Sequence, residues 1–215
     1  MGDVPPADVV ADDVVAPTAR RCGPGPRGAA GSPPVVVRER TDGDVGAAAE
    51  VLARVHAADG YPSRWPADPE AWLRPDGARG AWVAAEGTAL LGHVLLVDRA
   101  PGRGLATDAP LEVVRLFVDP AARGRGLAAA LLAAAVGRAE ELGLDVDLQV
   151  VAASPAVGAY ERLGWRAVRR HLASWTEADG TRPEVVRMAP PAAGVPSGPT
   201  GPSVATGAVR VGGAA

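Results

Sequence analysis

One segment constrains the fold of this chain more than any other: an apolar run at residues 111–118 leads through a glycine-bearing turn into a long helical pattern. The run has the length and composition of a buried strand, and Asp119-Pro120 ends it. From Gly124 the apolar residues recur at helical spacing, and the helix is expected to stop near Gly143. A strand that turns directly into a helix predicts a sheet with helices packed on its faces.

The turn itself has the chemistry of an anion site. A helix start exposes unpaired N–H groups and the positive end of the macrodipole, so backbone donors alone can hold a diphosphate. Gly124 and Gly126 let a ligand approach the backbone, while Arg123 and Arg125 offer charge to phosphate oxygens. A Walker A motif is excluded because the chain has no Lys, and Ala129 stands where a dinucleotide fingerprint needs its third glycine. The alternative is a glycine turn before an ordinary helix, with solvated arginines.

The remaining patterns predict an α/β (α+β) domain with a mixed, mostly antiparallel sheet in the order β-α-α-β-β-β-α-β-α-β-β. Strands are expected at residues 35–40, 81–85, 90–98, 111–118, 146–150, 165–175 and 185–188. Helices are expected at about 41–58, 68–73, 124–143 and 154–164. Residues 1–34 and 190–215 are rich in Pro, Gly and Ala and are expected to be disordered, which leaves residues 35–189 as one folded domain.

Composition argues against several classes of function. The net charge of -3 is too small to favour nucleic acid or an anionic membrane surface as a partner. The lone Cys22 cannot form an internal disulfide, and it makes no Cys/His metal set with His56, His93 and His171. No apolar run reaches the roughly 20 residues that span a bilayer, and no signal peptide is recognisable at the start. We expect a cytoplasmic protein with no metal.

Two motifs resemble the GNAT superfamily of N-acetyltransferases. The pyrophosphate loop of that family has the form R/Q-x-x-G-x-G/A, which Arg123, Gly126 and Ala128 fill. The family's segment Y-E-x-x-G-F/W is matched by residues 160–165, in the family's order and at roughly its spacing. One position departs: many relatives have Asn where this chain has Ala153, and Ser154 beside it either caps a helix, contacts the cofactor or does both.

The resemblance implies direct transfer of an acetyl group from acetyl-CoA to an amine, without a covalent enzyme intermediate. It implies that strand backbone bonds the pantetheine arm, with one N–H polarising the thioester carbonyl, and that the turn holds the diphosphate. The cofactor-binding residues expected on this basis are Leu116, Phe117, Val118, Arg123, Gly124, Arg125, Gly126, Leu127, Ala128, Ala129, Ser154 and Tyr160.

The same resemblance implies two catalytic residues. Tyr160 would donate a proton or a hydrogen bond to the departing thiolate, because a phenol with a pKa of ~10 is protonated near neutral pH. The alternative for Tyr160 is a core tyrosine on a buried helix face. Glu112 corresponds to the general base of several relatives, and the alternative there is a plain surface carboxylate. The face that Glu112 occupies cannot be assigned from alternation, because this family often has a bulge in that strand.

An acceptor site is expected at the loop between the first two helices, where Tyr61, Arg64 and Trp65 cluster. The alternative is that Trp65 and Trp72 cover the edge of the core. The sequence therefore predicts an N-acetyltransferase for a small-molecule or peptide amine. Two other functions stay open: a non-catalytic acyl-CoA-binding regulatory module, and an acetyltransferase for protein N-termini or lysines. The acyl length and the oligomeric state are also open, a homodimer being one option.

Overall fold

The computed structural model describes residues 33–99, 109–177 and 180–191. The tails predicted at residues 1–34 and 190–215 lie outside these ranges, apart from residues 33, 34, 190 and 191. Cys22 lies outside them as well.

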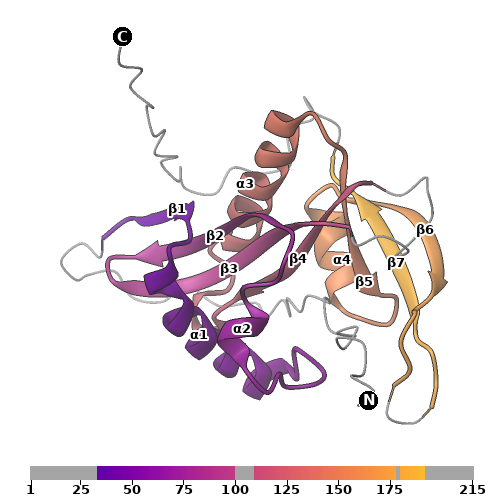
Figure 1. The fold of residues 1–215 in the computed structure, drawn as a ribbon, viewed down its shortest axis with the longest axis horizontal. Helices are drawn as coiled ribbons and strands as arrows, with labels where there is room; N and C mark the ends of the chain where they lie inside the picture. The colour runs from indigo at the N-terminus through magenta and orange to yellow at the C-terminus, as the bar shows by residue number, and fades with distance from the viewer. Residues whose placement is uncertain (1–32, 100–108, 178–179, 192–215) are drawn as a thin grey trace, which may run out of the picture.

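The described elements follow the predicted order (Figure 1). Two short 3-10 turns are added, η1 (Asp42–Asp44) before the first helix and η2 (Pro120–Ala122) after the fourth strand. The strands are β1 (Val35–Glu39), β2 (Ala78–Glu86), β3 (Ala89–Asp98), β4 (Leu111–Val118), β5 (Val146–Val151), β6 (Arg166–Leu172) and β7 (Glu184–Ala189). The helices are α1 (Val45–Asp59), α2 (Pro69–Trp72), α3 (Leu127–Leu142) and α4 (Ala156–Arg162). The predicted mixed, mostly antiparallel sheet flanked by helices is confirmed.

The strands form one sheet in the order β1-β2-β3-β4-β5-β7-β6. All neighbours pair antiparallel except β4 and β5, which run parallel. Their pairing begins with Leu111 opposite Val146 and ends with Val113 opposite Leu148. No later residue of β4 pairs with β5 in the described part of the chain, while β5 continues against β7 as far as Val151. The sheet therefore divides at its centre just after Val113.

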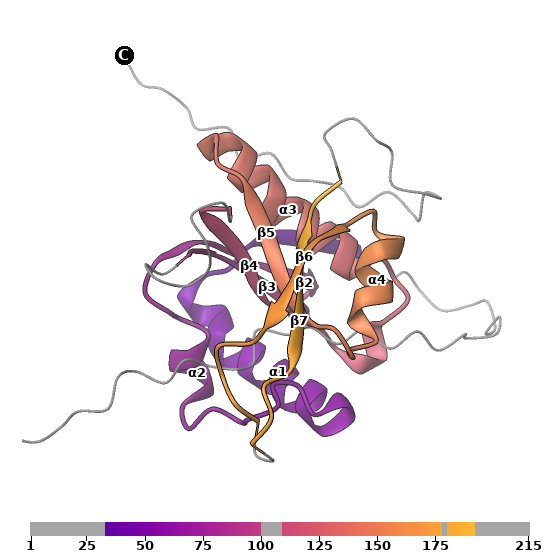
Figure 2. The ribbon, with the colours of Figure 1, turned by 90° about the vertical axis from the view of Figure 1, so that its right-hand side faces the viewer.

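Helices cover the two faces of the sheet (Figures 1 and 2). Helix α3 buries residues spaced three or four apart, which pack with Tyr160 of α4 and Leu116 of β4 in one core. Helices α1 and α2 pack on the opposite face, around Val83 and Phe117. Leu116 and Phe117, which follow one another in β4, thus face different cores, as alternation along a strand requires. No helix in the described ranges has the length and hydrophobicity needed to cross a bilayer.

Candidate active site

The turn between β4 and α3 is built from a capped 3-10 turn and two glycines. Asp119 Oδ1 accepts a hydrogen bond of 2.9 Å from the amide of Ala121, and its Oδ2 accepts one of 2.7 Å from Arg54 Nε of α1. Gly124 and Gly126 both have a φ of 77°, in the left-handed region that glycine adopts without strain. The first backbone bond of α3 runs from Ala130 N to Gly126 O, so the amides of residues 127–129 precede the helical ladder.

Open space lies in front of both glycines. A Cβ added to Gly124 or Gly126 would meet no atom within 4 Å. The positive φ and the open space together leave the turn's backbone accessible to a ligand, next to a helix start with its positive dipole end. This geometry fits a diphosphate. The described residues contain no group of three or more His, Cys, Asp or Glu side chains that could hold a metal ion.

Both arginines of the turn are paired with carboxylates. Arg123 donates through Nη1 to Asp59 Oδ1 at 3.1 Å and through Nη2 to Asp59 Oδ2, which joins the turn to the end of α1. Arg125 binds Glu86 at the end of β2 at 2.6 Å, and this hydrogen bond lowers the pKa of Glu86. The structure therefore places the two side chains predicted to bind phosphate in ion pairs around the turn.

Strand β4 has a bulge beside the point where the sheet divides. His93 of β3 pairs with Phe117, and Leu95 pairs with Val114, so Val94 alone stands opposite Arg115 and Leu116. Arg115 has a φ of 53° and is the only non-glycine residue with a positive φ in the described ranges. Its guanidinium lies over the Trp72 ring of α2, 4.4 Å from the ring centroid. The bulge places the side chains of Val114 and Arg115 on the same side of the strand.

The backbone beyond the bulge is directed toward the divided side of the sheet. The amide of Asp119 donates to Leu91 O of β3 at 2.8 Å. Because the polar groups of successive strand residues point in opposite directions, those of Val118 and Leu116 point away from β3. No strand residue in the described ranges pairs with them there. Leu116 and Val118 thus lie where an extended ligand arm would find backbone partners, whereas Phe117 between them pairs with His93 of β3.

Tyr160 on α4 is buried in the core shared with Leu116 and is 2 % exposed. Its hydroxyl has no hydrogen-bond partner among the described residues, and its ring is tilted against Trp165 at 6.1 Å. Burial raises the pKa of Tyr160 well above 10, so the phenol is protonated at neutral pH. Near the start of the same helix, Ser154 Oγ accepts a 3.2 Å hydrogen bond from Ala156 N. Ser154 therefore has a capping contact, although Pro155 occupies the cap position itself.

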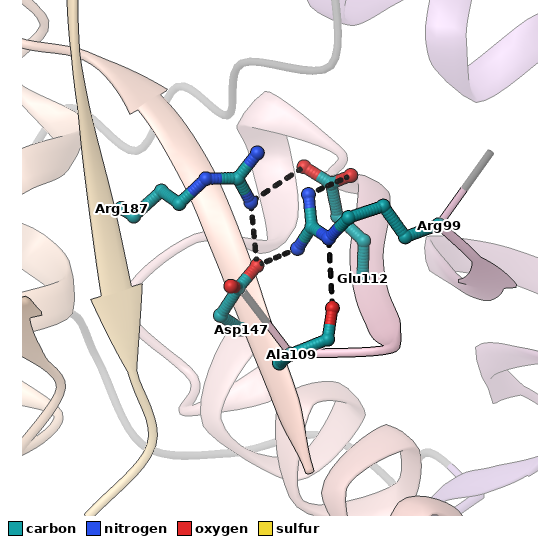
Figure 3. A network of polar contacts seen from close by, with 5 residues as sticks. All are labelled: Arg99, Ala109, Glu112, Asp147 and Arg187. Carbon is teal, nitrogen blue, oxygen red and sulfur yellow. Dashed lines mark hydrogen bonds and ion pairs between the residues drawn. The ribbon is translucent and has the colours of Figure 1, made fainter. Parts of the chain in front are cut away.

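Glu112 belongs to a network of four charged side chains, of which Asp147 and Arg187 are buried and Arg99 and Glu112 partly buried (Figure 3). Arg99 binds Glu112 at 3.1 Å, binds Asp147 of β5, and donates from Nε to Ala109 O at 2.7 Å. Arg187 of β7 binds Asp147 at 3.0 Å and lies 4.0 Å from Glu112. Glu112 and Asp147 are register partners at the parallel junction, so the arginines separate two adjacent like charges. The network joins β4, β5 and β7 where the sheet begins to divide.

The predicted acceptor residues do not share one environment. Tyr61 is 5 % exposed and packs edge-to-face against Trp72, 6.4 Å away, within the α1-side core. Trp65 is exposed and lies 5.0 Å from the ring of His56, whose Nδ1 donates to Pro62 O at 2.9 Å. Arg64 is exposed. The loop therefore presents Arg64 and Trp65 on its surface, whereas Tyr61 faces the core.

Residues 67–178, more than half of the chain, match the family model of the acetyltransferase (GNAT) domain. The chain is a GNAT acetyltransferase. This confirms the resemblance found in the two motifs, and the activity class of the protein is that of an acyltransferase.

Many solved structures share the fold of this GNAT acetyltransferase, and three from different organisms are described below. The ribosomal-protein-S18-alanine N-acetyltransferase from Escherichia coli is 20% identical, with a TM-score of 0.53 over 73% of this chain and 93% of that chain. The putative acetyltransferase yncA from Salmonella typhimurium, solved with acetyl-CoA, is 18% identical, with a TM-score of 0.55 over 72% and 91%. Arabidopsis thaliana NAA60 with a bisubstrate analogue is 20% identical, with a TM-score of 0.55 over 72% and 96%. No curated protein matches the sequence.

Several residues that shape the site of this GNAT acetyltransferase were not singled out from the sequence. Asp59 binds the turn, Arg115 forms the bulge, and Arg99, Asp147 and Arg187 surround Glu112. A signal for three of them is present, because Arg115, Asp147 and Arg187 interrupt apolar strands and a charge inside a strand needs a partner. Asp59, at the end of a helix, has no comparable signal.

Proposed function

We propose that this enzyme binds acetyl-CoA across the divided sheet and transfers its acetyl group directly to a primary amine of a small molecule or peptide. The main support is the turn before α3: two left-handed glycines face open space beside the amides of a helix start. Acetyl-CoA supplies the thioester whose acyl group is transferred. The acetyl-CoA bound to the Salmonella protein supports this cofactor for a chain of the same fold.

The backbone residues have two tasks in this proposal. Residues 124–129 bind the diphosphate through their amides, and Leu116 to Val118 bond the pantetheine arm as a neighbouring strand would. One of these strand amides polarises the thioester carbonyl, where negative charge develops as the amine attacks. Arg123 and Arg125 begin in pairs with Asp59 and Glu86, so phosphate oxygens would share or replace those carboxylates.

Tyr160 is proposed as the group that protonates the leaving thiolate. The C–N bond forms as the C–S bond breaks, the electron pair of that bond goes to sulfur, and the phenol donates its hydrogen there. The acylated nitrogen loses one proton as the amide forms, and a proton taken up by the phenolate restores Tyr160, so the step balances. Its hydroxyl is buried and lacks a partner among the described residues, which leaves the donor available to the reaction. The raised pKa keeps that hydrogen in place at neutral pH.

The assignment of Glu112 as general base stays a prediction. Because Glu112 also forms ion pairs, a test must separate a catalytic role from a structural one. A base must accept the proton that the ammonium group loses before it attacks. Arg99 and Arg187 stabilise Glu112 as an anion, and opposite charges at such short range make a carboxylate a weaker proton acceptor. Arg64, Trp65 and Tyr61 remain the proposed acceptor-binding residues. Tyr61 would act indirectly, by packing in the core beneath the loop and so holding the loop in place.

The cofactor site is tested by a matched pair of substitutions at the two ends of α3. Gly126→Ala and Gly143→Ala each place a Cβ on a left-handed glycine, with φ of 77° and 66°, and neither Cβ meets an atom within 4 Å. Both variants should lose about 1–2 kcal/mol of stability from the backbone alone. Only Gly126→Ala should weaken acetyl-CoA binding, by at least tenfold in calorimetry. Equal affinity in the two variants would remove the turn from the cofactor site.

The acceptor and the chemistry are tested by turnover. Thiol release from acetyl-CoA is measured with free amines, amino acids, antibiotic amines, peptides with a free N-terminus and lysine peptides. Tyr160→Phe should lower kcat about 100-fold on the best acceptor while leaving the Kd for acetyl-CoA within a factor of three. Unchanged turnover would exclude Tyr160 as the proton donor. Tight acetyl-CoA binding with no acceptor in any class would favour the non-catalytic acyl-CoA-binding module.

A further inference from the structure

The bulge in β4 is a strained feature that requires support from its surroundings. A left-handed conformation at a non-glycine residue costs about 1–3 kcal/mol and persists only where neighbouring groups over-determine it. Arg115 adopts this conformation beside the division between β4 and β5. The amide of Leu116, which follows it, belongs to the backbone proposed to bond the pantetheine arm. The Arg115 carbonyl and the Leu116 N–H belong to one planar peptide unit. A group that binds the Arg115 carbonyl therefore also fixes the direction of the Leu116 N–H.

His93 holds the bulge through the carbonyl of Arg115. Its ring is fully buried in β3 and stacks on Phe117, 5.1 Å away and 20° from parallel. His93 Nδ1 lies 3.0 Å from Arg115 O, and since a carbonyl only accepts, the nitrogen donates. The histidine thus binds the carbonyl at the residue where the strand departs from regular geometry.

Arg40 fixes the tautomer that this bond requires. Arg40 Nη1 donates to His93 Nε2 at 2.9 Å and also to Leu73 O at 2.6 Å. A guanidinium cannot accept a hydrogen bond, so Nε2 is the unprotonated nitrogen and Nδ1 bears the hydrogen. Burial, with the nearby charges of Arg40 and Arg115, lowers the pKa of His93 to about 3. The ring is therefore neutral, and its single N–H points at the bulge.

We propose that His93 is a positioning residue for acetyl transfer: by donating from Nδ1 to the carbonyl of Arg115, with Arg40 fixing its tautomer, it sets the bulge that aims the Leu116 amide at the thioester. This inference rests on the proposed function, because it assigns the amide a reacting partner. His93 does not touch the substrate and does not exchange protons. It acts through backbone geometry alone, with the Arg115–Trp72 contact as a second support of the bulge.

Two substitutions separate the two hydrogen bonds of His93. Asparagine places an amide nitrogen two bonds from Cβ, as Nδ1 is, and can keep the bond to Arg115 O. Glutamine places its amide one bond further out, near Nε2, and can keep the bond to Arg40 instead. Both lose the ring and its stacking on Phe117, so both should lose similar stability. The difference between His93→Asn and His93→Gln therefore reports on the bulge and not on core packing.

Steady-state kinetics and calorimetry with acetyl-CoA are measured for both variants and the parent protein. We expect kcat to fall about 100-fold in His93→Gln, as an atomic displacement of about 1 Å at a reacting group does. We expect a fall of less than tenfold in His93→Asn, with the Kd for acetyl-CoA changed less than threefold in both. Equal losses of kcat in the two variants, or parental kcat in His93→Gln, would overturn the proposal.

Two measurements that need no turnover keep the proposal separate from the proposed function. Nitrogen NMR of labelled His93 should show the Nδ1–H tautomer from neutral pH to pH 5, and the Nε2–H tautomer would overturn the assignment. A crystal structure of His93→Gln should show Arg115 leaving its positive φ, whereas an intact bulge would contradict the inference. If the parent protein acetylates no amine, the proposed function fails, and these two results still decide whether His93 sets the bulge.

Discussion

Removing one charge from the network around Glu112 should cost more stability than most single substitutions do. Glu112→Gln keeps the shape of the side chain but leaves Arg99 and Arg187 with Asp147 as their remaining carboxylate in the network (Figure 3). The two arginine side chains are only 7% and 4% exposed, so water cannot replace the lost charge. Two unit charges about 4 Å apart interact by about 4 kcal/mol at an effective dielectric constant near 20. Breaking buried pairs costs about 3–5 kcal/mol, which agrees with that value.

Thermal unfolding measures the loss. For a domain of this size, each kcal/mol lowers Tm by roughly 2–4 °C, so Glu112→Gln should unfold on the order of 10 °C below the parent protein. Asp147→Asn is the matched control, because it removes a charge from the same network at the neighbouring strand position. Asp147 binds both arginines closely, so its loss should be at least as large. Added salt should change either value little, since buried pairs are weakly screened.

The same two variants test the predicted base. If Glu112 accepts the ammonium proton, kcat should fall further in Glu112→Gln than in Asp147→Asn. The pH profile of kcat/KM of Glu112→Gln should also lack its acidic limb. If Glu112 only joins the strands, the two variants lose activity in parallel with their stability. A Tm for Glu112→Gln within 2 °C of the parent value would refute the reasoning about buried charge.

Three further outcomes are expected. Burial raises the pKa of Tyr160 in the folded protein well above 10, its value in the unfolded chain. The stabilising contribution of this shift is therefore complete below pH 10 and is lost as the pH rises toward the folded-state pKa. Denaturant titrations should show less alkaline destabilisation in Tyr160→Phe. Burial, with the nearby charges of Arg40 and Arg115, lowers the pKa of His93 from 6.5 to about 3. The free energy of unfolding should therefore fall as pH drops from 6.5 toward 3, by up to about 1.4 kcal/mol per pH unit, and His93→Asn should lack this component. Arg125→Gln should leave the free energy of unfolding almost unchanged in the same titrations, because water reaches both partners of its pair with Glu86.

The order of elements and the position of the turn could be predicted because both depend on local pattern. The apolar run of β4, the change of period at α3 and the glycines at both of its ends are adjacent in the sequence. The strand limits shifted where pairing extended them: β2 was expected from residue 81 and begins at Ala78. In the added residues at the start of β2, Arg79 binds Asp98 of β3 at 2.8 Å. The spacing of apolar residues alone does not predict this contact between strands.

The details of the site depend on contacts between distant segments, and these could not be predicted. Nothing in the sequence separates a regular β4 from one with a bulge at Arg115, because the conformation is held by His93 and Trp72 from elsewhere in the chain. Arg123 could be identified as a cation near the predicted phosphate site, but its pairing with Asp59 depends on where α1 ends. Likewise, an aromatic loop residue such as Tyr61 can face either water or core, and only packing decides.

Because β4 and β5 stop pairing after Val113, this sheet has an unpaired strand border at its centre as well as at its two outer strands. Outer borders invite other polypeptides to add on, and β6 counters this with Arg166, Arg169 and Arg170 along its length. The inner border of β4 is almost wholly apolar and has no such charges after Arg115, yet β5 on its other side encloses it. The border proposed to bind the pantetheine arm is thus kept from pairing with other polypeptides by its place inside the sheet.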